Sequence, residues 1–266
     1  MQATPLADWP LNERAGIRGV LTDIDDTLTA DGALAPEAEA ALRRLRQAGL
    51  PVLAITGRPA GWSEPFALAW PIDAIVAENG AVALWNEQGR LRKAYTQDEP
   101  TRRANFTHLQ AAAALVQREL PHARLATDSA GRETDIAIDH SEHAHLSDAD
   151  IARVLALLRG QGLTATVSSI HINAWIGEHD KLSGARWIVH QRLGRELEAE
   201  IHQWVYVGDS TNDAVMFARF PHSVGVANVA RFWPQLSHHP RYVAPRERGA
   251  GFADVAEAVL AAQGAQ

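Results

Sequence analysis

VLTDIDDTLT, residues 20–29, places three aspartates within four positions directly after an apolar run. A short apolar run that ends in polar residues is typical of a buried parallel strand. Because side chains along a strand alternate with a period of two, Asp23 and Asp25 can both face one site near the strand's end. Taken alone, the stretch also fits a turn with a capping aspartate. It does not fit an EF-hand loop, whose glycine and distal glutamate are missing.

Further apolar runs along the chain end in the same way, in a glycine or a polar cluster. They are PVLAITGR (51–58), AIVAENG (74–80), WVYVGDS (204–210) and HSVGVAN (222–228). Helices are predicted between or after these runs, at 35–50, 180–194 and 212–220. Strands that alternate with helices form a parallel sheet covered by helices on both faces. We therefore predict a doubly wound, Rossmann-like α/β core made of residues 1–84 and 179–266.

The first predicted helix, APEAEAALRRLRQAGL (35–50), carries its own start and stop signals. Pro36 suits the first helical turn and Gly49 suits the end. Its apolar stripe is predicted at Ala40, Leu42 and Leu45. The segment completes a β-α-β unit with the runs on either side of it.

Residues 85–178 follow a different pattern from the core. A helix is predicted at 102–119, an alternating strand at 134–139, a second helix at 148–159, and strands around 164–176. This order predicts a smaller α+β domain inserted into the core. We expect it to act as a cap over the edge of the sheet where the parallel strands end.

Polar side chains follow several of the predicted core strands, at their carboxyl ends. They are Asp23, Asp25, Thr56, Asn79 and Asp209. Open α/β sheets bind their ligands at this edge. Asp213 adds a fourth carboxylate, and four carboxylates in one dry pocket resist ionisation unless a cation joins them. A hard divalent ion with oxygen ligands, Mg²⁺, is the best match, and Lys181 supplies further positive charge.

In this order the motifs resemble those of a known superfamily. Asp23-Ile-Asp-Asp-Thr27, Thr56 within AITGR, Lys181, and GDSTND (208–213) are similar to the four motifs of the haloacid dehalogenase superfamily of phosphotransferases. The insert between the second and third motifs, the GDxxND form and AENGA (77–81) resemble its type-IIB branch. That branch includes sucrose-phosphate, trehalose-phosphate and mannosyl-3-phosphoglycerate phosphatases. The resemblance covers nearly all of the core and only the outline of the insert.

The resemblance implies a role for each acidic residue. Asp23 would attack phosphorus and form an aspartyl-phosphate, while Asp25 would protonate the leaving oxygen and later activate water. A carboxylate at the position of Asp25 fits phosphatases and mutases and disfavours dehalogenation. Mg²⁺ would be held by the carboxylates of Asp23 and Asp209 and the backbone carbonyl of Asp25. Asp213 would complete the metal site by orienting a water or Lys181.

Other residues would meet the charge on the phosphoryl oxygens. Thr56 and Lys181 are placed to do so, because phosphoryl transfer spreads charge over those oxygens. Asn212 would contact phosphate or metal-bound water, Arg58 can share the phosphate, and Asn79 is assigned to substrate binding.

The third motif departs from the usual type-IIB pattern. That pattern has glycine directly after the lysine, whereas here Leu182 and Ser183 precede Gly184. Lys181 remains the best candidate, and the alternative is a solvated lysine at a helix start.

Substrate selection is expected in the cap. In SSIHINAWIGEHDK (168–181), alternation places His171 and Asn173 on one face of a strand and Ile172 and Ala174 on the other. We predict that the polar face looks down on the substrate, with a solvent-facing strand as the alternative. Imidazole and amide groups suit a hydroxyl-rich leaving group, which favours a sugar or polyol phosphate.

Two further features invite functional interpretations. The run DHSEHAH (139–145) brings His140, His143 and His145 together, but it lacks the helical spacing of a zinc site, so we expect exposed loop histidines. Tryptophans pack cores more often than they bind ligands, and Trp62, shortly after Arg58, is the one most worth testing.

Composition limits the classes of protein to which the chain can belong. The 266 residues are 46% hydrophobic and 21% charged, with no cysteine, which is typical of a globular protein without disulfides or thiolate metal sites. The absence of a secretory-type start and of a 20-residue apolar stretch predicts a cytoplasmic protein that does not cross a membrane. A formal net charge of −7 argues against a general affinity for nucleic acid or acidic membranes. A monomer or homodimer is expected.

The sequence therefore predicts a Mg²⁺-dependent phosphomonoesterase that acts on a small-molecule phosphate ester. A phosphosugar mutase on the same machinery is one alternative. A non-enzymatic phosphoacceptor or binding module is another, since two-component receivers also combine acids, a hydroxyl residue and a lysine. Receivers, however, are about half this size. They also carry the phosphoacceptor on a middle strand, whereas the expected acceptor here, Asp23, follows the first strand of the predicted core.

Overall fold

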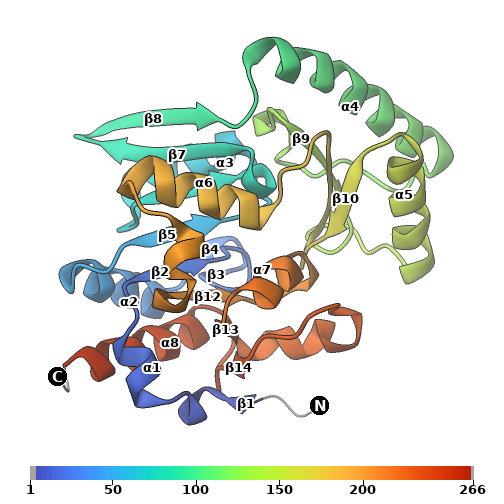
Figure 1. Ribbon diagram of the computed structural model, residues 1–266. Coiled ribbons are helices and arrows are strands. Elements are labelled where there is room, and N and C mark those ends of the chain that lie inside the picture. Colours follow the sequence, from blue (N-terminus) through green and yellow to red (C-terminus); the bar gives the residue numbers. More distant parts are fainter. Residues whose placement is uncertain (1–3, 265–266) are drawn as a thin grey trace.

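The computed structural model describes residues 4–264, and its largest element is a nine-stranded sheet (Figure 1). The strands are β1 (Thr4–Pro5), β2 (Gly19–Thr22), β5 (Val52–Ile55), β6 (Ala74–Ala77), β7 (Val82–Glu87), β8 (Arg90–Tyr95), β12 (Trp204–Gly208), β13 (His222–Gly225) and β14 (Tyr242–Val243). Their order is β1-β14-β13-β12-β2-β5-β6-β7-β8. Neighbours from β1 to β6 run parallel, and β7 and β8 continue the sheet antiparallel. The predicted α/β class is confirmed.

Helices cover both faces of this sheet. One face packs against α2 (Pro36–Gln47), α3 (Ala60–Ala69) and α8 (Arg248–Gln263), and α1 (Leu11–Ala15) packs on α8. The other face packs against α6 (Lys181–Leu193), α7 (Ala214–Arg219) and the 3-10 helix η4 (Leu197–Gln203). Along β2, Val20 points to the first face and Leu21 to the second. Both faces need apolar side chains, so the strands are continuous apolar runs rather than alternating ones.

The central strands place the polar residues that follow them at one edge of the sheet. β2, β5, β6 and β12 are buried along their whole length. Since these four strands are parallel neighbours, Asp23, Thr56, Glu78 and Asp209 follow their carboxyl ends at the same edge. A small hairpin of β3 (Thr29–Ala30) and β4 (Ala33–Leu34) lies just beyond β2.

The apolar stripe of α2 differs from the prediction at one position. Ala38, Ala41, Leu42 and Leu45 are buried, whereas Ala40 is exposed. With 3.6 residues per turn, positions 38, 41, 42 and 45 share one face, and position 40 points away from it. The placement of Ala40 in the stripe was therefore wrong.

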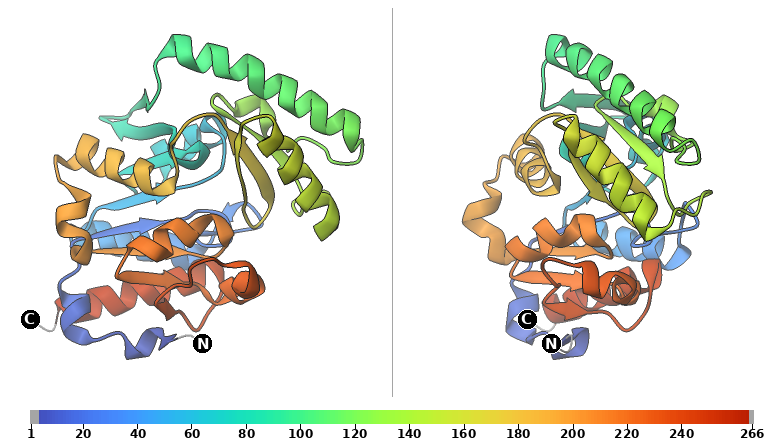
Figure 2. Two further views of the ribbon diagram at one scale, coloured as in Figure 1. Left: turned by 45° about the vertical axis from the view of Figure 1, so that its right-hand side comes forward. Right: turned by 90° about the vertical axis from the view of Figure 1, so that its right-hand side faces the viewer.

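Residues between β8 and α6 form a second, smaller layer structure. It contains α4 (Glu99–Glu119), β9 (Asp135–Asp139), α5 (Asp148–Gly160), β10 (Thr164–Val167) and β11 (His171–Trp175). The three strands pair antiparallel in the order β10-β11-β9, and α4 and α5 lie on one side of them (Figures 1 and 2). A separate apolar cluster fills the space between the helices and this sheet. We refer to residues 96–178 as the cap.

The predicted helices and strands of the cap are confirmed, with one shifted helix start. α4 begins at Glu99 rather than at residue 102, because the Asp98 side chain caps the helix by accepting a 2.9 Å hydrogen bond from the Thr101 amide. The end of β7 and all of β8, which the predicted boundary at 84/85 assigns to the insert, pair with the large sheet instead. The division into core and cap domains itself stays a prediction.

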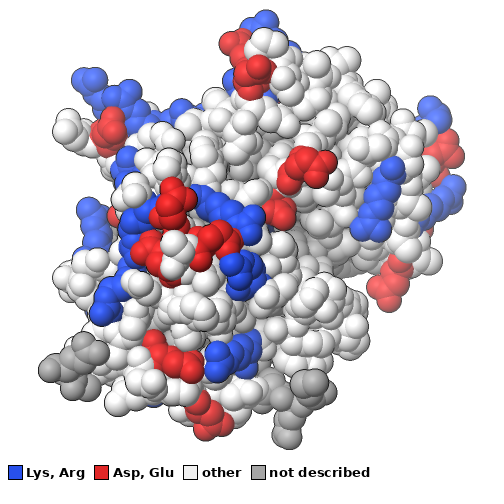
Figure 3. Space-filling model, in the orientation of Figure 1, with Lys and Arg blue, Asp and Glu red and all other residues white. Residues whose placement is uncertain are grey.

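The described part of the molecule also bears on membranes and surface charge. No helix within residues 4–264 combines the length and apolar composition that a bilayer span requires. On the face seen in Figure 3, acidic and basic side chains are interspersed among uncharged ones. That face therefore offers no extended area of one sign.

Candidate active site

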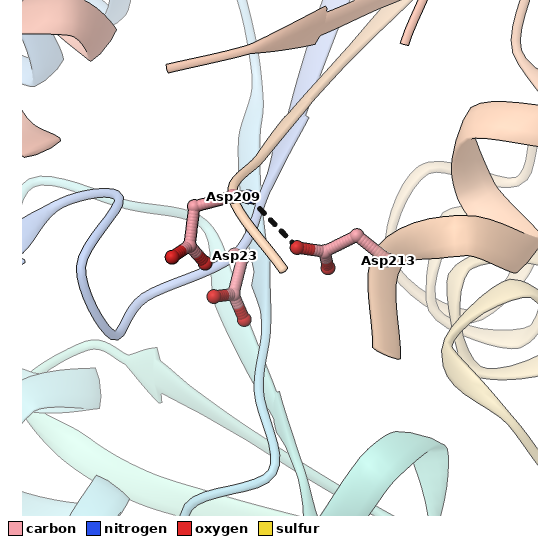
Figure 4. A group of neighbouring side chains, drawn as sticks. All are labelled: Asp23, Asp209 and Asp213. Atoms are coloured by element: carbon pink, nitrogen blue, oxygen red, sulfur yellow. Dashed lines mark hydrogen bonds between the residues drawn. The ribbon is translucent and has the colours of Figure 1, made fainter. Parts of the chain in front are cut away.

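Three aspartates meet at the carboxyl edge of the sheet. Asp23 follows β2 and Asp209 follows β12, the neighbouring strand, while Asp213 ends the 3-10 turn that precedes α7 (Figure 4). One carboxylate oxygen from each lies within 4.8 Å of the others. The three residues are 4%, 0% and 0% exposed. The predicted convergence of these acids, 186 residues apart in the case of Asp23 and Asp209, is present in the structure.

Lys181 is the cation inside this cluster. Its Nζ lies 2.6 Å from Asp23 Oδ1 and 2.7 Å from Asp213 Oδ1. A capping box, made by Asp180 and Ser183, fixes the start of α6 and thereby the lysine. Burial alone lowers the pKa of Lys181, but the attraction of Asp213 and Asp23 outweighs it and raises the pKa above its usual value. Lys181 is thus a buried ammonium, and the alternative of a solvated lysine is wrong.

The glycine of the third motif, Gly184, has a steric role. A Cβ built on Gly184 would lie 2.6 Å from Gly80 Cα, and one on Gly80 would lie 2.2 Å from the Asp180 carbonyl oxygen. α6 therefore touches the turn after β6 backbone to backbone, and only glycine fits at these two positions. Gly80 also has a φ of +115°, which favours glycine.

The carboxylates of the cluster are hard to ionise together. Burial raises the pKa of Asp23 to about 8, although Lys181 acts in the opposite direction. Burial, reinforced by the charges of Asp23 and Asp213, holds the pKa of Asp209 well above its usual range. One lysine does not balance three buried acids, so the cluster favours a further cation.

The carboxylates of the cluster differ in how many of their oxygens accept hydrogen bonds from the protein. Asp213 accepts from Lys181 and the Tyr206 hydroxyl through Oδ1, and from the amides of Asp209 and Ser210 through Oδ2, at 2.8 and 3.0 Å. Asp209 Oδ1 is buried and has no hydrogen-bond partner within residues 4–264. Asp209 therefore presents a free ligand oxygen, whereas Asp213 holds the loop that carries Asp209. Both fit the oxygen chemistry of a divalent ion and its supporting residues.

Asp25 lies beside the cluster and is bound by Arg58. The Arg58 Nε donates to both carboxylate oxygens of Asp25, at 2.9 and 3.1 Å. Its two Nη atoms donate to Asp128 at 3.1 Å and Glu142 at 2.8 Å, and its guanidinium lies 5.1 Å from the centre of the Trp62 ring. Arg58 thus joins the core to two carboxylates of the cap. These bonds use the Nε hydrogen and one hydrogen on each Nη, so two Nη hydrogens of Arg58 are left for a phosphate contact.

Thr56 and Asn79 lie at adjacent strand ends. The Thr56 hydroxyl accepts a hydrogen bond from the backbone amide of Arg58 at 3.0 Å, and the backbone amide of Asn79 donates to the Thr56 carbonyl at 2.9 Å. Asn79 has a φ of +55° and is 1% exposed, yet neither its Oδ1 nor its Nδ2 has a partner in the described chain. The side-chain amide of Asn79 is therefore available to bind a ligand oxygen. Asn212 lies in the turn after Asp209, where its Oδ1 accepts from the Ser210 hydroxyl at 2.9 Å.

The polar face of β11 packs against the core loop after β5. His171 and Asn173 are 2% and 1% exposed, so the alternative of a solvent-facing strand is wrong. His171 Nε2 lies 2.9 Å from Glu142 Oε2, and Asn173 Nδ2 donates to the Gly57 carbonyl at 3.1 Å. The hydrogen bond to His171, together with Arg58, holds the pKa of Glu142 at about 2. The predicted cap residues therefore reach the site through Glu142 and Gly57.

Several residues of this region were missed from the sequence. Glu78 is fully buried, and its carboxylate accepts from the amides of Ala60, Glu133 and Thr134. Arg132 Nη1 donates to the Gly57 carbonyl at 3.0 Å. Glu78 stands beside Asn79 after an apolar run, which is a usable signal, whereas Arg132, Asp128 and Glu142 lie in unpatterned loop sequence.

The histidine run differs in part from expectation. His143 and His145 are exposed as predicted, but His140 is 5% exposed, and its Nε2 lies 3.0 Å from the Ser168 carbonyl oxygen. Both carboxylate oxygens of Asp139 accept hydrogen bonds from the backbone amides of residues 141–144, and these bonds shape the loop around Glu142.

A cavity of about 490 Å³ lies between this loop and the core. Its lining includes Asp25, Asp26, Arg58, Glu142, Arg231 and Arg248.

Comparison with known proteins places this geometry in context. A family model described as haloacid dehalogenase-like hydrolase matches residues 20–110. A phosphoglycolate phosphatase from Methanothermobacter thermautotrophicus is 26% identical over 260 residues, which cover 91% of this chain and 97% of that protein. A crystal structure from Thermoplasma acidophilum has a TM-score of 0.68 at 18% identity, covering 92% of this chain and 98% of that one. The sucrose-phosphatase of Synechocystis sp. PCC6803 has a TM-score of 0.64 at 16% identity, with 91% and 97% covered. At such identities the two structures support the fold.

Proposed function

We propose that this chain, whose residues 20–110 match a model described as haloacid dehalogenase-like hydrolase, is a Mg²⁺-dependent phosphomonoesterase that acts through an aspartyl-phosphate on Asp23. Its substrate is a small phosphorylated metabolite with a hydroxyl-rich leaving group, a sugar or polyol phosphate. The relative named phosphoglycolate phosphatase and the neighbour named sucrose-phosphatase support phosphate-ester chemistry for this chain.

The observation that carries this proposal is the free, buried Oδ1 of Asp209 next to Asp23 and Lys181. Mg²⁺ would be held by the carboxylates of Asp23 and Asp209 and the carbonyl oxygen of Asp25. When bound, the ion supplies positive charge that keeps the acids ionised and neutralises the phosphoryl oxygens. Asp213 keeps its own hydrogen bonds to Lys181 and to the loop of Asp209.

The residues of the chain then have separable roles in the transfer. Asp23, ionised beside Lys181, attacks phosphorus. Asp25 donates a proton to the leaving oxygen and afterwards takes one from the attacking water, while Arg58 orients its carboxylate. The Thr56 hydroxyl and the Asn79 amide bind phosphoryl oxygens at the two neighbouring strand ends.

We assign substrate selection to the cap. The cavity of about 490 Å³ has the size of a small-metabolite site. His171 acts through Glu142, which lines that cavity, and Asn173 acts through the Gly57 carbonyl. Closure of a cap over such a site excludes water before transfer.

A leaving group with a carboxylate is a second candidate substrate. Arg231 and Arg248 line the same cavity from the core side, and their side chains are 52% and 29% exposed. Guanidinium groups bind carboxylates through paired hydrogen bonds. A phosphorylated hydroxy acid belongs in the substrate panel for this reason.

The test measures inorganic phosphate released from a panel of sugar, polyol and hydroxy-acid phosphates with and without Mg²⁺. Asp23→Asn should abolish release, since it removes the nucleophile and keeps the volume, while Asp8→Asn at an exposed site serves as the matched control. With radiolabelled substrate, acid quenching should leave a label on the wild-type protein that hydroxylamine removes. Hydrolysis by Asp23→Asn at the wild-type rate refutes the mechanism, and a bisphosphate product with little free phosphate indicates a mutase.

A further inference from the structure

Asn228 lies beside the cluster of Asp23, Asp209 and Asp213 and has no part in the roles described so far. It belongs to the 3-10 helix η6 (Ala227–Gln235), which follows β13, and it is 1% exposed. The amide of Val226, two residues earlier, donates to the Gly208 carbonyl at 3.0 Å, so this segment is tied to the end of β12. The Asn228 side chain is therefore held next to the loop that carries Asp209.

The side-chain amide of Asn228 has three hydrogen-bond partners from three different segments. Its Nδ2 donates to Asp209 Oδ2 at 3.0 Å and to the Asp26 carbonyl oxygen at 3.0 Å. Its Oδ1 accepts from the Arg248 amide at 2.9 Å. Both donor hydrogens of the amide are used, each on an acceptor of a loop at the carboxyl edge.

These contacts decide which oxygen of Asp209 is free. Oδ2 is engaged by Asn228, while Oδ1 is the buried oxygen without a partner. A carboxylate held at one oxygen cannot rotate to exchange the two without breaking that bond. We propose that Asn228 is a positioning residue for the Mg²⁺ site, which orients Asp209 so that Oδ1 faces the ion; this rests on the function proposed above.

The hydrogen bond from Asn228 to the Asp26 carbonyl also positions the loop after β2, which carries the other expected metal ligands. Asp26 has a φ of +53°, a conformation that non-glycine residues rarely adopt. It directly follows Asp25, whose carbonyl is the expected third ligand. By donating to both Asp26 and Asp209, Asn228 fixes the spacing between the loop after β2 and the loop after β12.

The alternative is that Asn228 only anchors η6 and the start of α8. Both roles predict a loss of stability when the amide is removed, so stability alone does not separate them. Residues that hydrogen-bond to metal ligands raise metal affinity by roughly 10–100-fold, whereas a purely structural anchor leaves it unchanged in the folded protein.

The test is Mg²⁺ binding to the folded, substrate-free protein by titration calorimetry, with Mn²⁺ binding followed by electron paramagnetic resonance as a second probe. Asn228→Ala should weaken binding at least about tenfold. Ser223→Ala in β13 is the matched control, because it removes the hydrogen bonds that the Ser223 hydroxyl makes to the Phe217 carbonyl and the Arg241 amide without touching Asp209. Its affinity should stay within about twofold of wild type, since no hydrogen bond to a metal ligand is lost.

The outcomes separate this inference from the proposed function. If the wild type binds neither ion, the metal site itself is wrong. If the wild type binds Mg²⁺ and Asn228→Ala binds it equally well, the proposed function stands and the positioning role is refuted. Asn228→Ser, which keeps one hydroxyl donor, should give an intermediate affinity. If neither Asn228 variant folds while Ser223→Ala does, Asn228 is a structural residue and the inference is also overturned.

Discussion

Replacing Lys181 with methionine removes the cation from the buried acidic cluster and keeps a side chain of similar length. The Nζ of Lys181 lies 2.6 and 2.7 Å from Asp23 and Asp213, and its side chain is 1% exposed. Removing one partner of a buried ion pair leaves an uncompensated charge, which costs about 3–5 kcal/mol. For a chain of this size that corresponds to a fall in melting temperature on the order of 10 °C.

Two conditions should reduce this loss of stability, because each removes the uncompensated negative charge that causes it. Mg²⁺ replaces the missing positive charge, so the difference between variant and wild type should be larger in EDTA than in millimolar MgCl₂. Protonation also neutralises the acids. Burial already raises the pKa of Asp23 to about 8, so the difference should shrink as the pH falls from 8 to 6.

The assay is thermal unfolding followed by circular dichroism, with Lys93→Met as the control. Lys93 also bridges two carboxylates, those of Glu64 and Glu133, with its Nζ at 2.7 and 2.6 Å from their oxygens. Unlike Lys181, its side chain is 22% exposed, and it makes no ion pair with the aspartates of the cluster. We expect Lys93→Met to cost about 1 kcal/mol or less, with no response to Mg²⁺. Lys181→Met unfolding at the wild-type temperature in EDTA, or a difference that Mg²⁺ does not change, refutes the reasoning.

The remaining predictions concern selection, stability and pH. His171→Ala should change the ranking of substrates more than the rate with a small aryl phosphate; equal loss of kcat/KM on all substrates assigns His171 to catalysis instead. Glu78→Gln should lower the free energy of unfolding in urea by about 2 kcal/mol, because an amide cannot accept all the hydrogen bonds that the carboxylate accepts, whereas exposed Glu87→Gln should cost under about 0.5 kcal/mol. Burial lowers the pKa of His179 to about 4, so the unfolded chain binds its proton first as the pH falls below 6.5. The wild type should lose about 1–2 kcal/mol more than His179→Asn between pH 7.5 and 5, and parallel losses contradict this.

The sequence predicts the fold well where residues close in sequence determine a residue's environment, and poorly where contacts with distant segments determine it. The runs at 20–29 and 204–210 predict strands because burial on both faces demands apolar residues at every position. The acids after these runs meet because parallel strands end at one edge. Ala40 shows the limit of the periodic argument, since one position along a helix turns a side chain by about 100° and moves it from core to solvent.

Residues that act on the site through a third residue leave no local pattern. Asn228 reaches Asp209 across 19 positions, and Glu142 reaches Arg58 across 84. An asparagine after a strand and a glutamate in a histidine-rich loop are common, and only the folded chain places their side chains within hydrogen-bonding distance of the site. Sequence reasoning therefore found the acids, the lysine, the threonine and Arg58, and missed Asn228 and Glu142.

The carbonyl oxygen of Gly57 is one of the points at which the cap contacts the proposed phosphate site. It accepts hydrogen bonds from Arg132 at 3.0 Å and Asn173 at 3.1 Å, both in the cap, and it lies between Thr56 and Arg58 in sequence. A Cβ at Gly57 would lie 3.1 Å from Asn173 Oδ1, so the cap packs closely against this position. A movement of the cap that breaks these two bonds releases the segment that carries both the Thr56 hydroxyl and the guanidinium that holds Asp25. Cap position and orientation of the proposed acid are thus coupled through this carbonyl as well as through the bonds of Arg58 to Asp128 and Glu142.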